Sequence, residues 1–193
     1  MPISNHVNLV DLDHPLRSTV AAFGAGGKST LARAIAHKHG LAQIELDEIQ
    51  WTPGWRMRPD EEIKDIVTVE MNAGHDGWVT DHQTRCVLPM ILERAESVIV
   101  LELPFRVLLW RRLKRTVRRA MTREIVCGGN RETFRQLFLS RDSAVLEMWQ
   151  RRKRYARIGE TISAGAAPGV DLFYVRSAGE LDRFYELQGL RRA

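Results

Sequence analysis

Short apolar segments alternate with helical patterns along most of this chain. The segments are rich in β-branched residues, and they cover 18–23, 40–47, 77–81, 96–104 and 170–175. Nearly continuous apolar runs of this length are typical of strands that a parallel sheet buries on both faces. The run at 96–104 is the clearest, because it is almost wholly apolar until Pro104 ends it. The pattern therefore predicts five strands.

Between these segments, apolar residues recur at the three- and four-residue spacing of a helix. This spacing predicts helices from Lys28, from Asp60, over 105–120, over 131–162 and from Ala178. Strands that alternate with helices indicate an α/β fold. We expect a doubly wound five-stranded parallel sheet, in which ligands bind beyond the carboxyl ends of the strands.

The remaining segments complete the predicted organisation. Residues 1–17 form a polar leader that we expect to be loosely held; the alternative is that it docks as an irregular strand or turn. Residues 121–130 carry no regular pattern. Because 193 residues with 44% hydrophobic content can bury one substantial core, we expect a single domain over 1–193.

A phosphate-binding loop lies between the first predicted strand and helix. Its residues are Gly24, Ala25, Gly26, Gly27, Lys28, Ser29 and Thr30. In such a loop, backbone N–H groups wrap the β-phosphate, the lysine reaches the β- and γ-phosphates, and the next hydroxyl ligates Mg²⁺. We predict that ATP and Mg²⁺ bind here, with Ser29 as the metal ligand. The full motif places glycine where this chain has Ala22, but the three later glycines keep the conformational freedom that the loop needs.

The charge of the chain adds an electrostatic preference. The formal net charge is +5 and the sequence pI is about 9.6, so anionic substrates are attracted. No apolar stretch has the length that spans a bilayer, and the amino terminus lacks the pattern of a signal peptide. We expect a cytoplasmic protein, monomeric or homodimeric, without a membrane partner.

Acidic residues follow the second and third predicted strands. These are Glu45, Asp47 and Asp81, and the predicted fold places them on the same rim as Lys28. A carboxylate at that position can hold Mg²⁺ through its waters or accept the proton of a substrate hydroxyl. We predict that Asp47 or Asp81 has this role; the alternative is a helix cap or a solvated loop residue.

Further candidates on this rim would contact a second substrate. Trp51 and Trp55 offer flat faces on which a base or ring could stack, although both could equally pack over the sheet edge. Arg85 follows Asp81 by four residues and could bind a phosphate or carboxylate, or simply pair with a local acid. We predict that Asp47, Trp51, Trp55, Asp81 and Arg85 bind the acceptor.

Two clusters of basic residues follow the fourth predicted strand. The first contains Arg106, Arg111, Arg112, Lys114, Arg115, Arg118, Arg119 and Arg123, and the second contains Arg151–Arg154 with Arg157. Most of these side chains are expected to be solvated. Two or three arginines would suffice to stabilise charge on a transferring phosphoryl group.

Several of these motifs together resemble a known family. They are the phosphate loop through Ala32, Leu46-Asp47, Trp51-x-Pro53-Gly54-Trp55 with Pro59, Trp78-Val79-x-Asp81, the run from Ala95 to Pro104, the Arg-x-x-x-Arg run in the following helix, and the Arg152-Lys153-Arg154 cluster. The chain resembles the adenylate-kinase-like P-loop proteins described as DNA topology modulation or FlaR-type proteins, over about residues 19–185.

The resemblance implies a nucleoside-monophosphate-kinase type of fold. It also implies a mobile lid, at about 121–141, that carries arginines over the nucleotide. With it, Arg115 and Arg152 become the candidate catalytic arginines beside Lys28. The family commonly has Asp-Gly-Asn-Tyr where this chain has Asp81-His82-Gln83-Thr84, so the acceptor could differ from that of its relatives.

The function predicted from these features is transfer of the γ-phosphate of Mg-ATP to a small acceptor. The acceptor bears a hydroxyl or a phosphate, and a nucleotide or nucleoside is preferred. The alternative is a nucleic-acid-associated ATPase whose arginine-rich helices hold phosphate backbones.

Overall fold

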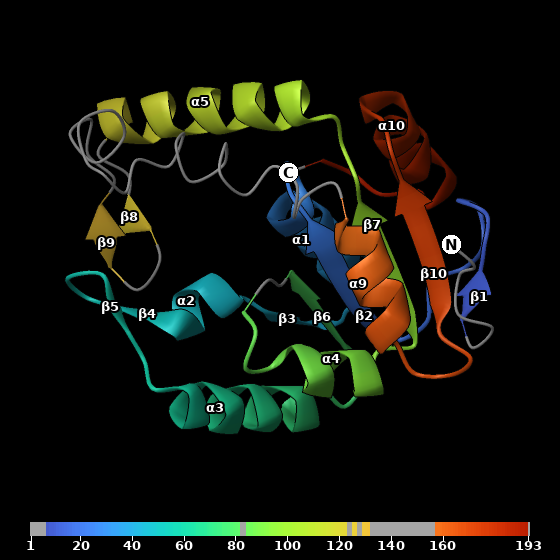
Figure 1. The fold of residues 1–193 in the computed structure, drawn as a ribbon, viewed down its shortest axis with the longest axis horizontal. Helices are drawn as coiled ribbons and strands as arrows, with labels where there is room; N and C mark the ends of the chain where they lie inside the picture. The colour runs from blue at the N-terminus through green and yellow to red at the C-terminus, as the bar shows by residue number, and fades with distance from the viewer. Residues whose placement is uncertain (1–6, 82–83, 123–124, 127–128, 132–156, 193) are drawn as a thin grey trace.

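A six-stranded, fully parallel sheet forms the centre of the protein (Figure 1). The computed structural model describes residues 7–81, 84–122, 125–126, 129–131 and 157–192. Across the sheet, the strands stand in the order β1 (Asn8–Leu9), β10 (Asp171–Val175), β7 (Ser97–Leu101), β2 (Thr19–Gly24), β6 (Trp78–Asp81) and β3 (Ala42–Ile44). The strand that leads into the phosphate loop, β2, therefore lies inside the sheet between β7 and β6.

The sheet has six strands rather than the five predicted, because the leader pairs with the outer edge of β10. Asn8 N–H donates to Val170 C=O over 2.8 Å, and Val10 N–H donates to Leu172 C=O over 3.1 Å. The buried carboxylate of Asp171 accepts from Arg17 Nε over 2.6 Å. From residue 7 onward, the leader is therefore not loosely held, and the alternative of a docked strand or turn describes it.

We expect Asp171→Ala to release the leader and to lower the free energy of unfolding by about 2–4 kcal/mol, because Arg17 loses its buried acceptor. Urea denaturation at neutral pH measures this loss. Glu61→Ala, which removes an exposed partner of Lys64 on helix α3 (Asp60–Ala73), is the matched control and should change stability far less. Equal effects of the two substitutions would contradict the anchoring role of Asp171.

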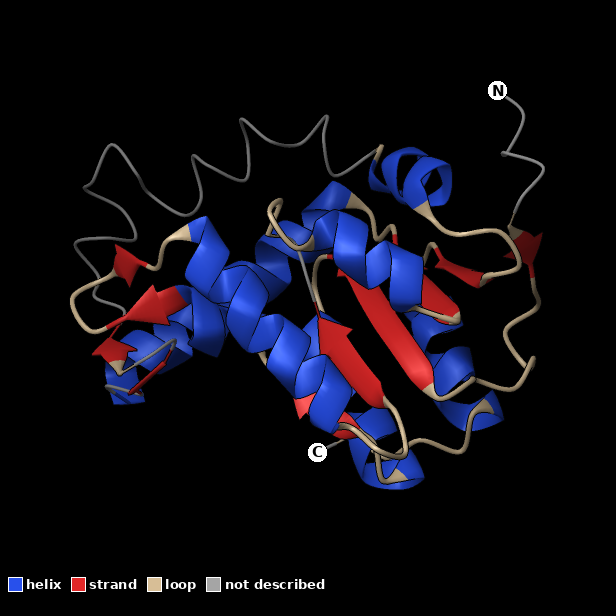
Figure 2. Cartoon of the chain, turned by 90° about the horizontal axis from the view of Figure 1, so that it is seen from below, coloured by secondary structure: helices blue, strands red, loops and turns tan. Residues whose placement is uncertain are grey.

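Helices cover both faces of the sheet (Figure 2). On one face, α3, α4 (Leu88–Arg94) and α9 (Ile158–Gly165) pack on Ala21, Phe23, Val98 and Leu172. On the other face, α1 (Lys28–His39) and α10 (Ala178–Leu187) pack on Val20, Ile99 and Phe173. Neighbouring strand residues thus enter opposite cores, as the continuous apolar runs indicate.

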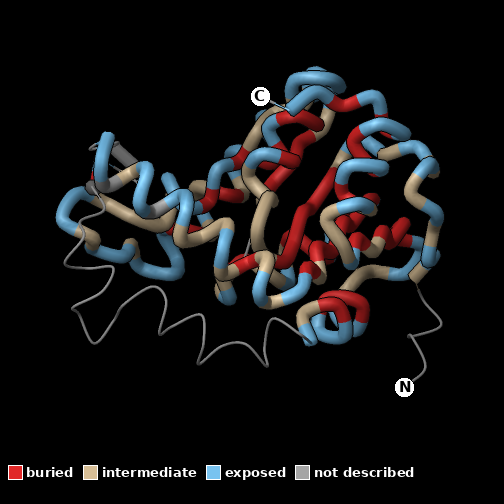
Figure 3. Tube along the Cα trace, turned by 90° about the horizontal axis from the view of Figure 1, so that it is seen from above, coloured by how far each residue is buried: buried red, intermediate tan, exposed pale blue. Residues whose placement is uncertain are grey.

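An arm extends from this core beyond the carboxyl ends of the strands. Helix α5 (Phe105–Thr122) forms one side and leads to the hairpin of β8 (Ile125–Val126) and β9 (Asn130–Arg131). The other side consists of α2 (Leu46–Gln50) and the hairpin of β4 (Trp51–Thr52) and β5 (Arg56–Met57). Figure 3 shows that the arm is far less buried than the sheet.

Three predicted elements need correction. The second strand ends at Ile44 rather than at Asp47, because Glu45 C=O accepts from the N–H of Ile49 and starts α2. Part of the irregular segment 121–130 belongs to the β8–β9 hairpin. The helix predicted over 131–162 is not continuous, since α9 begins after Arg157, whose φ of −118° is not helical. Residues 132–156 lie outside the described part of the chain.

Candidate nucleotide site

The phosphate loop lies between β2 and α1, and two of its glycines are required by geometry. Gly24 has φ +101°, and a Cβ there would lie 2.1 Å from the carbonyl oxygen of Leu101 on the neighbouring strand. Gly26 has φ +81°, and a Cβ there would lie 2.6 Å from Leu108 Cδ2. Ala22, where the full motif has glycine, is buried within β2 and pairs with Asp81 and Ile99. Alanine is therefore compatible with this loop.

A cavity of about 530 Å³ lies over the loop, and its walls are strongly cationic. All seven loop residues from Gly24 to Thr30 line it. The arginines that line it are Arg33, Arg111, Arg112, Arg115, Arg118, Arg119 and Arg192. Within the described part of the chain, no aspartate or glutamate belongs to this lining. Such a cavity attracts and concentrates polyanions.

Residues of α5 and α10 line this cavity together. Arg111 Nη1 donates a hydrogen bond to the carbonyl oxygen of Gly26, so α5 is tied directly to the loop. From α10, Leu181 and Tyr185 add an apolar wall, and Arg192 lies 4.8 Å over the ring of Tyr185. Burial raises the pKa of Tyr185, and the nearby guanidinium groups of Arg192 and Arg111 oppose this rise.

The structure brings Lys28, Ser29 and Asp81 together at the base of the loop. Asp81 is the last residue of β6, and Ser29 Oγ donates a hydrogen bond to Asp81 Oδ2. Burial raises the pKa of Asp81, while the charge of Lys28 and the Ser29 hydrogen bond lower it. The carboxylates of Asp47 and Glu45 add to the rise. Of the three candidate acids, Asp81 is therefore the one in direct contact with the loop.

Asp47 and Glu45 lie farther out on the rim. Asp47 is exposed in the first turn of α2, and not at the end of a strand as predicted. Glu45 precedes α2 and lies 4.0 Å from Arg33 Nη2. Both carboxylates influence the pKa of Asp81 and so belong to the same electrostatic environment.

Of the remaining residues predicted to bind the acceptor, Trp51 and Trp55 lie on the arm, whereas Arg85 lies outside it. Trp51 and Trp55 pack edge to face, with ring centroids 5.7 Å apart. Arg85 is exposed in the turn before α4. In the described part of the chain, none of these three side chains lines the cavity over the phosphate loop.

Of the two candidate catalytic arginines, the structure describes only Arg115. Arg115 projects from α5, is exposed and lines the cavity over the loop. Arg152 lies outside the described residues, as does much of the predicted lid at 121–141.

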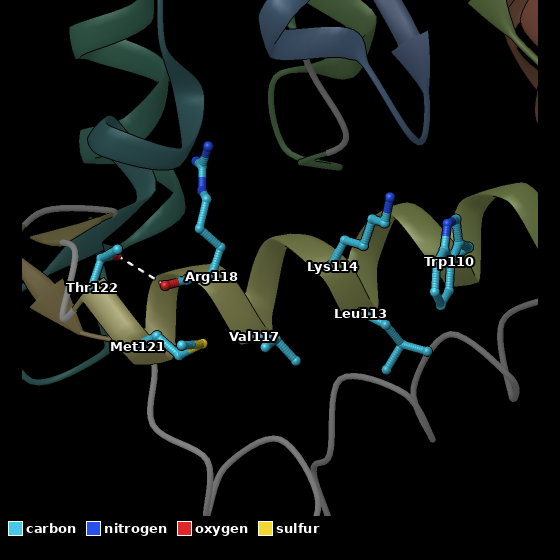
Figure 4. A pocket seen from close by; sticks show the side chains of 7 residues that line it. All are labelled: Trp110, Leu113, Lys114, Val117, Arg118, Met121 and Thr122. Atoms are coloured by element: carbon cyan, nitrogen blue, oxygen red, sulfur yellow. Dashed lines mark hydrogen bonds between the residues drawn. The ribbon is translucent and has the colours of Figure 1, made fainter.

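Sequence reasoning missed the contribution of α10 to this cavity. Leu181 and Tyr185 of α10, and Arg192 after the end of that helix, lie more than 150 residues after the loop and carry no motif. Sequence reasoning also missed the apolar face of α5, which Figure 4 shows from close by. Trp110, Leu113, Val117 and Met121 recur at spacings of three and four and form an apolar groove there. Helix α5 is therefore amphipathic and presents its arginines to the phosphate loop.

The described helices include none that is long and apolar enough to cross a membrane.

Several solved structures resemble this chain, and one of them has a similar overall extent. It is the unliganded crystal structure of a sugar kinase from Janibacter sp. HTCC2649, which aligns over 91% of each chain with 18% identity and a TM-score of 0.45. No family model and no curated protein matches the chain. At this identity and TM-score, the likeness assigns neither a substrate nor a catalytic residue.

Proposed function

We propose that this protein is a P-loop phosphotransferase that moves the γ-phosphate of Mg-ATP to a small acceptor. The observation that carries the proposal is the cationic cavity over the loop at Gly24–Thr30, in which Ser29 contacts Asp81. We propose an acceptor that bears a hydroxyl or a phosphate, with a nucleotide or nucleoside preferred. The arginines of α5 favour an anionic acceptor.

The loop residues fit a triphosphate. The left-handed backbone at Gly24 and Gly26 lets consecutive N–H groups face one concave surface, which is suited to phosphate oxygens. Lys28 opens α1, whose positive N-terminal end adds to the attraction. These residues would hold the β- and γ-phosphates and orient the γ-phosphorus toward the arm.

The oxygen donors near the loop fit Mg²⁺. Ser29 would ligate the ion directly, and Asp81 would hold it through water. Among the described residues, no group of three His, Cys, Asp or Glu forms a metal cage, so phosphate oxygens and water would complete the shell. When bound, the ion neutralises charge on the transferring group.

Further predicted residues would complete the site. Asp81 or Asp47 would orient the acceptor and accept its proton, while Arg115 and Arg152 would stabilise negative charge on the phosphoryl oxygens. Trp51, Trp55 and Arg85 would bind the acceptor itself. Closure of a lid at about 121–141 would exclude water from the reaction.

An assay of ADP release tests this proposal. The purified protein is incubated with Mg-ATP and a panel of nucleoside monophosphates, nucleosides and hydroxylated metabolites. We expect at least one acceptor to raise ADP release well above the acceptor-free rate, and omission of Mg²⁺ to abolish the increase. An absence of both ATP binding and ADP release across the panel would overturn the proposal.

A nucleic-acid-associated ATPase is the second candidate, because α5 exposes Arg106 and Lys114 in addition to the arginines over the loop. Such binding should weaken steeply between low and moderate salt, whereas transfer to a small acceptor should respond mildly. A filter-binding titration with DNA and RNA at two salt concentrations separates the two. Absence of binding at low salt would remove this candidate.

A further inference from the structure

The two sides of the arm are connected at its outer end by the β8–β9 hairpin. In Figure 1, α5 runs along one side, α2 and the β4–β5 hairpin run along the other, and the β8–β9 hairpin lies between their outer ends. The two sides are distant in sequence, and each begins beside the phosphate loop. Arg111 of α5 binds Gly26, and Asp47 of α2 lies within electrostatic reach of Asp81. The arm is therefore a ring, and its closure sets the distance between its two sides.

The side chain of Asn130 joins the two sides. Its Nδ2 donates to the carbonyl oxygen of Thr52 over 2.9 Å, and its Oδ1 accepts from the N–H of Trp55 over 2.8 Å. These contacts span 78 and 75 residues of sequence. Although the arm is largely exposed, Asn130 is only 5% exposed. A buried amide whose oxygen and nitrogen both bind main chain is strongly oriented.

The turn to which Asn130 is hydrogen-bonded contains a residue with an unusual backbone conformation. Thr52 pairs with Arg56 across the β4–β5 hairpin, and Pro53, Gly54 and Trp55 form the connecting loop. Trp55 has φ +56°, and it is the one residue other than glycine with a positive φ in the described part of the chain. A large side chain adopts this conformation at a free-energy cost. The hydrogen bond from Trp55 N–H to Asn130 helps to hold it there.

We propose that Asn130 is a positioning residue for the acceptor. It locks the turn that carries Trp51 and Trp55 to the hairpin at the end of α5, and so fixes the acceptor side of the arm relative to the arginines over the phosphate loop. The proposal rests on the proposed phosphotransferase activity for its kinetic consequences. Its structural consequence, a turn ordered by one amide side chain, is measurable without any acceptor.

Two substitutions at Asn130 separate the two hydrogen bonds. Asn130→Leu keeps the branched shape of the side chain and removes both bonds. Asn130→Asp keeps an oxygen that accepts from Trp55 N–H but cannot donate to Thr52 C=O when ionised. Thr122→Ala is the matched control, because it removes an exposed hydroxyl of the same arm that donates to Arg118 C=O within α5.

The first measurement is hydrogen exchange of the segment 51–57 in the ligand-free protein. We expect exchange at Trp55 N–H to be about tenfold faster in Asn130→Leu than in the wild type, to be intermediate in Asn130→Asp, and to be unchanged in Thr122→Ala. Unchanged exchange in Asn130→Leu would overturn the proposal, whether or not an acceptor has been found.

The second measurement is steady-state kinetics with the acceptor identified by ADP release. We expect the KM for the acceptor to rise about tenfold in Asn130→Leu, with the KM for ATP changed less than about twofold, and partial recovery in Asn130→Asp. Equal rises in the two KM values would contradict a role in acceptor positioning. If exchange accelerates but no variant or wild-type protein transfers phosphate, the phosphotransferase proposal fails while the ordering role of Asn130 stands.

Discussion

Replacing Lys28 by methionine should lower the rate of ADP release by about 10²–10³-fold and leave the fold intact. Methionine keeps much of the length of the side chain and removes the ammonium group. Lys28 is partly buried at the start of α1, and α1 packs on the sheet through Leu31, Ala32 and Ile35. Loss of the Lys28 ammonium group should therefore not disturb the core. Steady-state ADP release measures the rate, and thermal unfolding by circular dichroism checks the fold.

Lys64→Met on α3 is the matched control for Lys28→Met. Lys64 pairs with Glu61 at the surface and does not line the cavity over the phosphate loop. This variant should keep full activity. Full activity in Lys28→Met as well would overturn the assignment of the loop to phosphate binding.

Asp81→Asn should separate activity from stability. The rate of ADP release should fall by about 10²–10³-fold, because the carboxylate that contacts Ser29 is lost. Thermal stability at neutral pH should stay the same or rise. Burial raises the pKa of Asp81, so the ionised carboxylate costs the folded state free energy once the pH exceeds the ordinary value of 3.8. An amide removes that cost and keeps an oxygen for Ser29.

The same raised pKa predicts the pH dependence. As the pH falls through the raised pKa of Asp81, the carboxylate gains a proton, so the free-energy cost of its ionisation in the folded state is relieved. Activity is lost over the same pH range, because the neutral acid no longer acts as a base. In the profile of kcat/KM against pH, the midpoint of the acidic limb should therefore lie at a higher pH than the pKa of an ordinary aspartate. A profile of kcat/KM against pH measures this limb.

Asp47→Asn tests whether Asp47 or Asp81 acts beside the proposed Mg²⁺ position. Asp47 is exposed on α2, so its replacement should alter stability little, and we expect a weaker effect on ADP release than for Asp81→Asn. The proposed roles of the two aspartates would be reversed by either of two results. One is full activity with a lower melting temperature in Asp81→Asn, and the other is a larger loss of activity in Asp47→Asn than in Asp81→Asn.

The sequence predicts those parts of the molecule that local chemistry determines. The loop at Gly24–Thr30 is a contiguous motif, and the buried strands are continuous apolar runs that any flanking structure must cover. The helix from Asp60 is likewise found where the acids of its first turn and its apolar spacing place it. These elements need no knowledge of their distant neighbours.

Other parts depend on contacts that no local pattern carries. The two-residue strand β1 exists because the edge of β10 offers free backbone groups, and the sequence Asn8-Leu9 does not indicate it. The α2 helix replaces the end of a predicted strand because Glu45 C=O is free to start a helical turn. Asn130 gives no sequence signal at all, since its importance comes from Thr52 and Trp55.

The close approach of Gly24 to Leu101 has an entropic consequence. The first turn of the loop is part of the pairing between β2 and β7, so its shape is set when the sheet forms and not when a ligand arrives. A loop that is preorganised in this way loses little conformational freedom on binding, and more of the interaction free energy is retained as affinity. Loosening the register between these two strands should therefore weaken nucleotide binding even if every phosphate-contacting group remains.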